Sequence, residues 1–400
     1  MKPVASVPSL TLCVFGITTG EFVIAGILPD IAADLTVSIP AAGLLVTAYA
    51  IGMIVGGPVL TALTARFPRK PLILVLLGIT IAGNLASALA PAYGVLFAAR
   101  VVTALVTSTF FANAIVIAVS AAAPGKQAST VSRLVFGMNL SMILGAPIGT
   151  YIGGGYGWRS TFLAIAACCV LGFLLVLRLV PDVRGTAAPE PPAGSSVAAE
   201  LRVFRCGDVR VAIAVTAVAN AGLLMVFTFF APLVTEVAGF AGEAVAGLLL
   251  VYGLGAAAGN FVGGRLADRS PKWSQLGLLG ALAAALVLMW AVGGSAAATA
   301  IMVFVLGALG FSVIPGMQAR VLSAAAAAPT LAMAVNASAY QLAAALAAWL
   351  GGRVIDGGLG LRAVYLVGAA VTVAGILVSA YAWHGERGRA AVEPAGAARS

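Results

Sequence analysis

The amino-acid sequence predicts an all-α membrane protein with twelve transmembrane helices in two pseudo-symmetric six-helix bundles. Three observations predict this fold class: the composition, the spacing of the apolar runs and an internal repeat. The chain of 400 residues is 62% hydrophobic and 9% charged, and its mean hydropathy is +1.09. A soluble protein of this length does not bury so much apolar surface, because accessible surface falls behind mass only slowly.

Twelve apolar runs follow one another along the whole chain. Each is close to the about 20 residues that a helix needs to cross a hydrocarbon core. The first run is too long for a secretory signal, carries Glu21 near its centre and is followed by eleven more, so we expect it to remain in the mature protein. The runs cover residues 10–29, 41–62, 72–92, 94–121, 131–153, 160–180, 210–231, 244–264, 275–294, 297–319, 330–350 and 362–383.

The basic residues predict the orientation of the chain. With the N-terminus inside, nearly all of the 22 Lys and Arg lie in cytoplasmic segments, since only Arg159, Arg353 and Arg362 fall outside and Arg100 lies within a span. This asymmetry is the positive-inside rule. We therefore expect a multi-pass protein of the bacterial inner (plasma) membrane with both termini in the cytoplasm. The net charge of +9 reflects topology and does not indicate binding to nucleic acid.

An internal repeat relates the two halves of the chain by a constant offset of 203 residues. Agreement at several places, each at the same position relative to its span, indicates a duplication. The matching positions are Pro29 with Pro232, Tyr49 with Tyr252, Gly52 with Gly255, Gly56 with Gly259, Arg66 with Arg269, Arg69 with Lys272, Gly157 with Gly360, and Arg159 with Arg362.

The repeat and the longest polar interruption define the expected domains. Residues 1–180 form an N-terminal six-helix bundle, and residues 181–209 form a cytoplasmic linker rich in Pro, Gly and Ser, with a short surface helix expected near 197–205. Residues 210–383 form the second six-helix bundle. Residues 384–400 form a cytoplasmic tail that we expect to be disordered.

The composition excludes several classes of enzyme. Three of the four cysteines, Cys13, Cys168 and Cys169, fall in apolar runs and do not form a disulfide framework. The single histidine, His384, leaves neither a His-based metal centre nor a serine-hydrolase triad. The sequence has no Gly-x-x-x-x-Gly-Lys-Ser/Thr loop, which argues against an ATP-driven pump. We expect a secondary active transporter without a cofactor, driven by an ion gradient or by the gradient of the substrate itself.

Four motifs resemble those of the drug:proton antiporter branch of the major facilitator superfamily, the kind with twelve spans. The loop after the eighth span reads Gly264-Arg-Leu-Ala-Asp268-Arg269, which matches the gating motif of that family. The loop after the second span keeps Arg66, Arg69 and Lys70 but has Ala65 and Pro68 where the family usually has Asp and Gly. The fourth span carries Arg100 at the place of the family's buried arginine, followed by Thr103 and Ala104 in place of Gln-Gly. The fifth span contains Gly145-Ala-Pro147-Ile-Gly149 and Gly153, which resembles the antiporter motif.

The first span also resembles a group of bacterial exporters. The run Glu21-Phe-Val-Ile-Ala-Gly-Ile-Leu-Pro29-Asp30-Ile-Ala-Ala-Asp34-Leu, together with the altered loop at 64–70, is similar to exporters of chloramphenicol. Sugar and nucleoside efflux proteins have related sequences, so the resemblance does not fix the substrate. It implies the major facilitator fold, in which two halves rock about a site near the membrane midplane.

Glu21 and Arg100 are the candidate proton-coupling residues. Glu21 is the one acid that we place inside the hydrocarbon, where an ionisable group usually marks a proton or substrate path. At 1.5 Å per residue, it lies roughly 12 Å below the outer end of its span and Arg100 lies roughly 9–10 Å below the start of the fourth span. Desolvation favours the protonated acid and a nearby arginine favours the charged acid, so a change in their separation would load and release a proton. The alternative is a fixed ion pair that only orients the first span against the fourth.

The other motif residues are candidates for gating and packing. Charges in the gating loops, at Arg66, Arg69, Lys70, Asp268 and Arg269, can bind helix ends in one state and release them in another. The alternative is that these charges only establish the topology. Gly145, Pro147, Gly149 and Gly153 permit close helix contact and a bend in the fifth span, either to prevent leakage or as an ordinary packing face.

A substrate cavity is expected between spans 1, 2, 4, 5, 7, 8, 10 and 11. Thioethers, aromatic faces and a few polar groups suit varied amphipathic compounds, although each residue could instead pack in the core or face lipid. The candidates are Tyr49, Met53, Phe110, Asn113, Met138, Asn139, Met225, Phe229, Phe304, Phe311, Tyr340 and Gln341.

The predicted function is proton-coupled efflux of a small amphipathic compound, with a phenicol antibiotic as the sharpest hypothesis. The alternatives are export of a sugar or nucleoside metabolite, and a membrane receptor or scaffold that keeps the fold without transport. A buried acid and arginine argue against a scaffold, which gains little from them. The expected partners are a small-molecule substrate, protons and membrane lipid, and we expect a monomer that binds no nucleic acid.

Overall fold

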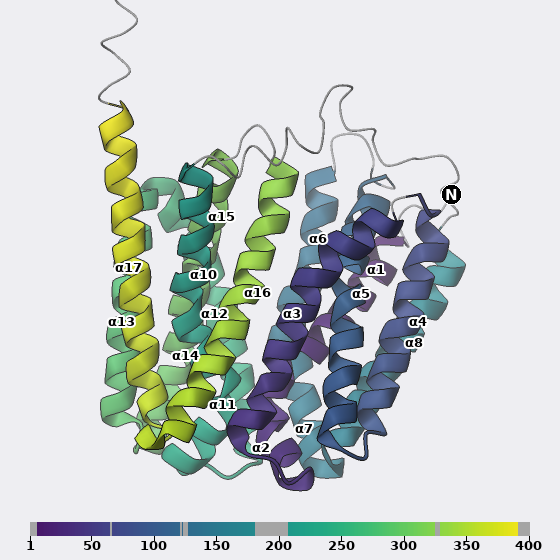
Figure 1. Cartoon of the computed structure of the whole chain (residues 1–400), viewed down its shortest axis with the longest axis horizontal. Coiled ribbons are helices and arrows are strands. Elements are labelled where there is room, and N and C mark those ends of the chain that lie inside the picture. Colours follow the sequence, from purple (N-terminus) through teal and green to yellow (C-terminus); the bar gives the residue numbers. More distant parts are fainter. Residues whose placement is uncertain are drawn as a thin grey trace, which may run out of the picture.

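The computed structural model describes residues 6–64, 66–120, 122, 127–180, 207–324 and 329–390, and these residues form helices and no strand. The helices stand side by side with roughly parallel axes (Figure 1). Within the described residues, eleven helices are long and apolar enough to cross a membrane, and the bent pair α1–α2 makes twelve if it is one span. The predicted fold class is confirmed.

The first half of the chain supplies six of these spans. Span 1 is the bent pair, whose two helices meet at 50°. Span 5 is interrupted by a single π-helical turn, η1, a feature that is frequent at functional sites. The helices are α1 (Ser6–Phe22), α2 (Ile24–Asp34), α3 (Ile39–Thr64), α4 (Arg69–Ala88), α5 (Tyr93–Ser120), α6 (Gln127–Leu140), η1 (Ser141–Gly145), α7 (Ala146–Tyr156) and α8 (Trp158–Leu179).

The second half repeats this arrangement. Its helices are α10 (Gly207–Thr228), α11 (Phe230–Pro232), η3 (Leu233–Val237), α12 (Ala244–Arg269), α13 (Pro271–Val292), α14 (Ala296–Ser312), α15 (Ile314–Ala324), α16 (Pro329–Val354), η4 (Ile355–Leu359) and α17 (Ala363–Ala390). We call the face where α8 ends and α10 begins the linker face, and the face where α7 ends and α8 begins the hairpin face.

Two helix ends differ from the expected boundaries. Helix α10 already begins at Gly207, and α17 continues to Ala390, so the first residues of the expected tail, 384–390, are helical. The continuation of α17 has a simple reason, because no proline follows its start before Pro394. The rest of the expected linker, 181–206 with its short surface helix, and the rest of the tail, 391–400, lie outside the described residues.

Glycines of the repeat pack the second span of each half against the fourth span of the same half. A Cβ atom on Gly56 of α3 would overlap the backbone of Leu105 in α5, and one on Gly259 of α12 would overlap the backbone of Ala308 in α14. The contacted positions, 105 and 308, differ by the same 203 residues as the glycines. The helix pairs therefore approach in the same way in both halves, and only glycine permits that approach.

Buried apolar side chains form separate clusters within the halves. One cluster consists of first-half residues such as Leu45, Leu77 and Phe110. Another is formed by second-half residues, joined by Ala25, Ala50 and Met142 of the first half. The halves meet where α3 packs on α16, where α7 and η1 pack on α12, and where α2 packs on α11. The interface between the halves positions the site described next.

Candidate functional site

A small cavity lies between the two halves. Its walls come from spans 1 and 2 of the first half and from α10 and α16 of the second half. It offers about 30 Å³ to the centres of water-sized molecules, enough for one or two waters. The lining residues are Glu21, Phe22, Ala25, Val46, Tyr49, Leu224, Phe227, Thr228, Tyr340, Gln341 and Ala344.

Glu21 reaches this cavity from the end of α1. It lies in the last turn of that helix, directly before the bend at Val23 that separates α1 from α2. The Nε2 atom of Gln341, on α16, donates a hydrogen bond of 2.9 Å to Glu21 Oε1 and also lies 3.1 Å from the sulfur of Met53 on α3. One amide of the second half thus contacts two side chains of the first half.

Arg100 is buried beside the cavity, and its side chain is 1% exposed. Its Cζ atom lies 4.3 Å from the centroid of the Tyr49 ring, a cation–π contact. Within the described residues, its Nε and Nη2 atoms have no hydrogen-bond partner. The Tyr49 hydroxyl shares a hydrogen bond of 3.1 Å with Thr107 Oγ1. The ring of Tyr49 therefore contacts the guanidinium and also forms part of the cavity wall.

Glu21 and Arg100 are neighbours without direct contact. Both residues are described, and no hydrogen bond or ion pair joins them to each other. Arg100 Nη1 lies 3.8 Å from the position of a Cβ on Gly20, the residue before Glu21, and the two charges interact electrostatically. The fixed ion pair considered above is not formed in this conformation. Glu21 is bonded instead to the opposite half.

The structure separates the predicted cavity residues into two groups. Tyr49, Tyr340 and Gln341 line the cavity, and Met53 contacts Gln341. The others lie elsewhere. Phe110, Met225 and Phe229 are buried in the cores of the two halves, Met138 packs against the first-half cluster, Asn139 is partly buried in α6, Phe311 packs on Tyr252, Phe304 is 42% exposed, and Asn113 is bonded to Arg69.

Several lining residues were missing from the sequence-based set. Phe22, Ala25, Val46, Phe227, Thr228 and Ala344 had no distinguishing signal, because apolar side chains, and a threonine bonded to its own helix, can face lipid, core or cavity equally well. Leu224 had one. It stands 203 residues after Glu21, so the repeat places it at the equivalent position of the other half.

The glycines of span 5 hold span 1 in place. A Cβ on Gly145 would overlap Thr19, and Cβ atoms on Gly149 and Gly153 would lie 2.7 Å from Val23 Cγ2 and 2.9 Å from Ile27 Cγ2. The motif, whose Pro147 is also buried, therefore packs against span 1 on both sides of its bend. On another face of the span, a Cβ on Gly253 of α12 would lie 2.7 Å from Ile143 Cα. Span 5 thus packs closely against Glu21's helix and against the second half.

The gating-loop residues lie at the linker face. Arg69 Nη1 donates a hydrogen bond of 2.6 Å to Asn113 Oδ1 on α5, which secures the start of α4. Arg66, Asp268 and Arg269 are exposed, Lys70 is partly buried, and position 65 lies outside the described residues. Within the part of the chain that is described, no hydrogen bond or ion pair joins Asp268 or Arg269 to the first half.

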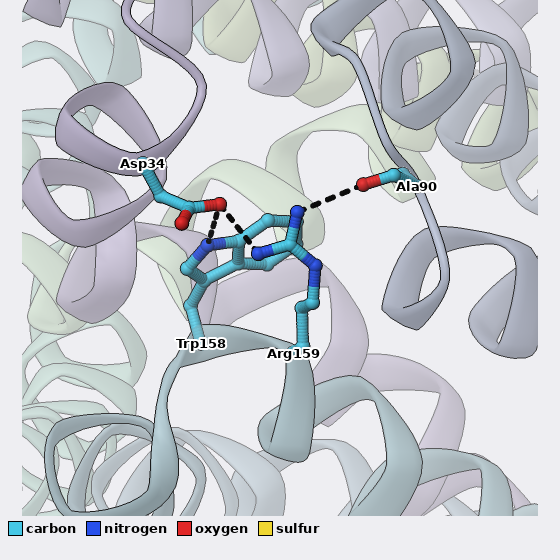
Figure 2. Close-up of polar contacts among 4 residues, drawn as sticks. All are labelled: Asp34, Ala90, Trp158 and Arg159. Atoms are coloured by element: carbon cyan, nitrogen blue, oxygen red, sulfur yellow. Dashed lines mark hydrogen bonds and ion pairs between the residues drawn. The ribbon is translucent and has the colours of Figure 1, made fainter.

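A polar cluster secures the opposite, hairpin face of the first half (Figure 2). Arg159, at the start of α8, forms an ion pair with Asp34 at the end of α2, and its Nη2 donates a hydrogen bond of 2.9 Å to Ala90 O. Trp158 Nε1 donates to the same carboxylate at 3.2 Å. We call Asp34, Trp158 and Arg159 the hairpin-face clasp. It joins the hairpin-face end of span 1 to span 6, a pairing that the sequence did not predict.

Comparison with known proteins identifies the class. A sequence model of the Major Facilitator Superfamily matches residues 10–348. The chain is 35% identical to the uncharacterized MFS-type transporter YfhI of Bacillus subtilis, over 94% of each protein. It is 36% identical to a chloramphenicol resistance protein of Streptomyces lividans, over 84% of this chain and 85% of that protein. The chain therefore belongs to the Major Facilitator Superfamily, a family of membrane transporters.

More distant similarities agree with this assignment. The chain is 27% identical to a probable sugar efflux transporter of Mannheimia succiniciproducens, over 92% of this chain and 91% of that protein. Its fold matches the crystal structure of a D-xylose–proton symporter with a TM-score of 0.74, 17% identity and coverage of 95% of this chain and 97% of that one. At this identity, the match with the symporter concerns the fold alone.

Proposed function

We propose that the protein is a secondary active transporter that exports small amphipathic compounds in exchange for protons, with Glu21 as the proton-binding residue. The observation that carries the proposal is the position of Glu21. Its carboxylate lines a cavity between the halves and is bonded to Gln341 of the opposite half. An acid that bridges the moving parts of a transporter can link its own protonation to their separation.

Arg100 sets how readily Glu21 gives up its proton. Its guanidinium is held on the Tyr49 ring, close enough to act on Glu21 through space. Movement of α1 relative to α5 changes that distance, and with it the balance between the charged and neutral carboxyl. The proton gradient across the membrane is the energy source, and no cofactor takes part.

The substrate enters a more open state of the same site. The present cavity has room for water only, so binding of a drug-sized molecule needs separation of the halves. The lining offers aromatic faces at Phe22, Tyr49, Phe227 and Tyr340 beside one carboxylate and one amide. Such a wall suits an amphipathic compound, and a phenicol is the first candidate. The named activity of the Streptomyces lividans relative supports this choice.

Export of a sugar or nucleoside is the second candidate. Tyr49, Thr228 and Tyr340 line the cavity together with Gln341, and side chains of these types can bond to the hydroxyls of a sugar. The named activity of the Mannheimia relative supports this candidate.

The orientation belongs to the same proposal. Arg66, Arg69, Lys70, Arg269 and Lys272 lie at the linker face, so the positive-inside rule places this face and both termini in the cytoplasm. Asp268 and the gating-loop arginines then act at the cytoplasmic entrance, where they contact helix ends in one state and release them in another.

Growth assays test the proposal. The chain is expressed in a bacterium that lacks its major exporters, and growth is measured on a panel of drugs, including chloramphenicol, with and without an uncoupler. We expect resistance to at least one amphipathic drug and loss of resistance with the uncoupler. Lower intracellular sugar without drug resistance would favour the second candidate.

A matched pair of variants identifies the coupling residue. Glu21→Gln keeps the shape of the side chain but cannot take up a proton, so its resistance should fall to that of cells with an empty vector. Asp30→Asn removes an exposed acid from the same span and should retain resistance. Uphill export by Glu21→Gln at the wild-type rate would reject the proposed role.

A further inference from the structure

Gln341 connects the two halves at the point where the charge of Glu21 can change. Its amide donates to Glu21 Oε1 at 2.9 Å and contacts the sulfur of Met53 at 3.1 Å, and the side chain is 8% exposed. A second bond between the halves also involves α16, where Thr47 Oγ1 of α3 donates to Ala345 O at 3.2 Å. Only the first of these bonds ends on an ionisable group.

The other groups around Glu21 are few. Helix α3 presents the phenol of Tyr49, α5 the guanidinium of Arg100 and α16 the phenol of Tyr340. Helix α10 presents only Leu224, Phe227 and Thr228 to the cavity, and the cysteines of α8 lie beside Gly16, more than a turn from Glu21. Among the described residues around Glu21, Gln341 is thus the one hydrogen-bond donor that reaches its carboxylate.

We propose that Gln341 is a positioning residue that senses the protonation of Glu21 across the interface between the halves. Its amide holds the second half to an ionised Glu21 and releases it when Glu21 takes up a proton. The inference rests on the proposed function, because it assumes that Glu21 titrates during transport. The inference adds to that function the residue, Gln341, through which the second half responds to protonation of Glu21.

The physical basis is the difference between a charged and a neutral acceptor. A hydrogen bond to a carboxylate is about twice as strong as one to a neutral group. In a site with little water the difference is not compensated by solvent. Protonation therefore weakens the Gln341–Glu21 bond but leaves the Thr47–Ala345 bond unchanged. The state described here has the amide donating to Glu21, which is the contact that an ionised carboxylate would strengthen.

The test uses the purified full-length protein in lipid nanodiscs and requires no substrate. Infrared spectra recorded across a pH series report protonated carboxyl groups, and subtraction of the Glu21→Gln spectra isolates Glu21. Gln341→Met keeps the length of the side chain but removes its donor. Since the lost bond stabilised the ionised form, the midpoint of the Glu21 transition should move to higher pH by about one to two units.

A matched control separates sensing from packing. Thr47→Val removes the neighbouring inter-half bond at nearly constant shape, and it should leave the midpoint of Glu21 unchanged. If Gln341→Met does not give folded protein, Gln341→Asn serves in its place, because its shorter amide cannot reach Glu21 and the same upward shift is expected.

A second readout follows the halves themselves. Spin labels at the exposed positions Phe67 and Trp273, in a background without native cysteines, report the separation of the halves at the linker face. In the otherwise native protein this separation should change with pH at the midpoint of Glu21. In Gln341→Met it should no longer follow that midpoint.

The outcomes distinguish this inference from the proposed function. An unchanged Glu21 midpoint in Gln341→Met, or an equal shift in Thr47→Val, would overturn the role of Gln341 while Glu21 remained the proton site. Absence of any titrating band removed by Glu21→Gln would overturn both.

Discussion

The two halves share one helix arrangement but differ at one buried position, which is charged in the first half and apolar in the second. In the first half Arg100 lies over Tyr49, with Phe162 at 5.9 Å. The repeat places Val303 at the equivalent of Arg100, and Tyr252 and Tyr365 at the equivalents of the two aromatic residues. There the structure has a small apolar cavity of about 10 Å³, lined by all three. A guanidinium thus occupies in one half the space that stays apolar in the other.

The central cavity has the same asymmetry. Glu21 lines it from the first half, and its repeat equivalent, Leu224, lines it from the second. The duplicated frame therefore brings two equivalent positions to one cavity, but only one of them is ionisable. The charges that we propose for coupling lie in the first half, and the second half contributes the neutral amide of Gln341.

A third difference lies at the hairpin face, where both halves have an equivalent arginine but only one of the two forms an ion pair. Arg159 donates to Ala90 O, and its equivalent Arg362 donates to Trp290 O at 2.7 Å and Ala291 O at 3.0 Å. Each arginine thus binds carbonyls at the end of the third span of its half, which favours a cation. Only Arg159 also pairs with an acid, because Val237 stands where the repeat would place the equivalent of Asp34. The duplication supplies the caps, and the first half adds the bond to span 1.

Substitution of the glycines at the close helix contacts should destabilise either half, and this is the largest effect that we expect. Gly56→Ala and Gly259→Ala each place a methyl group against the backbone of a neighbouring helix, which cannot move aside. Each should destabilise its half by about 3 kcal/mol, at the upper end of overpacking effects. The measurement is the yield of monodisperse protein and its thermal unfolding in detergent.

Matched glycines without close neighbours provide the controls. Gly78→Ala in α4 and Gly280→Ala in α13 meet open space and replace a poor helix former, so both should be neutral or stabilising. A clear difference between Gly56→Ala and Gly259→Ala would show that the two helix pairs do not share one packing geometry.

Removal of the charge from the first half should leave the fold intact and impair coupling. Arg100→Met makes the first half resemble the second, where Val303 is apolar, and it removes a buried charge whose Nε and Nη2 atoms have no hydrogen-bond partner, so we expect little loss of stability. Without the cation, the ionised form of Glu21 becomes less favourable relative to the protonated form, so release of the proton is hindered. Proton-driven export should therefore fall by about tenfold. Export is measured with a compound that the growth screen identifies.

The repeat equivalent of Arg100 in the second half, Val303, serves as the control for this prediction. Val303→Met changes the equivalent site of the second half and should leave export unchanged. Normal export by Arg100→Met would show that the asymmetry of charge has no part in coupling.

The sequence predicted the spans and the repeat because lipid imposes them. A span must be long and apolar, and every backbone group must bond within it, so length and hydropathy are sufficient. The family assignment followed from motifs such as Gly264–Arg269. The bend at Val23 was not predicted, because the proline of span 1, Pro29, lies further along α2. The bend lies where the glycines of span 5 contact span 1, which a reading of span 1 alone does not reveal.

The site was harder to predict than the fold for a physical reason. Depth along a helix follows from residue number, so the sequence placed Glu21 and Arg100 at similar heights. The direction of a side chain around its helix does not follow, because lipid and protein core are both apolar and the helices have no polar stripe to mark the interior. Phe304 was therefore expected in the cavity and lies exposed, and the Gln341–Glu21 bond joins residues 320 positions apart.

The smallest effect that we expect from the difference between the halves is at the hairpin-face clasp. Arg159→Met and Arg362→Met remove equivalent caps, but only the first also removes an ion pair, with Asp34. Both groups of that pair are partly exposed to solvent, so salt should screen their interaction, whereas bonds to carbonyls are less sensitive. In thermal unfolding, the difference between wild type and Arg159→Met should amount to a few degrees in low salt and shrink in about 1 M salt. The difference between wild type and Arg362→Met should depend on salt much less, and Asp34→Asn should reproduce the more salt-sensitive part alone. Equal salt dependence in the two arginine variants would mean that Asp34 adds nothing to the cap, and that the halves are equivalent at this face.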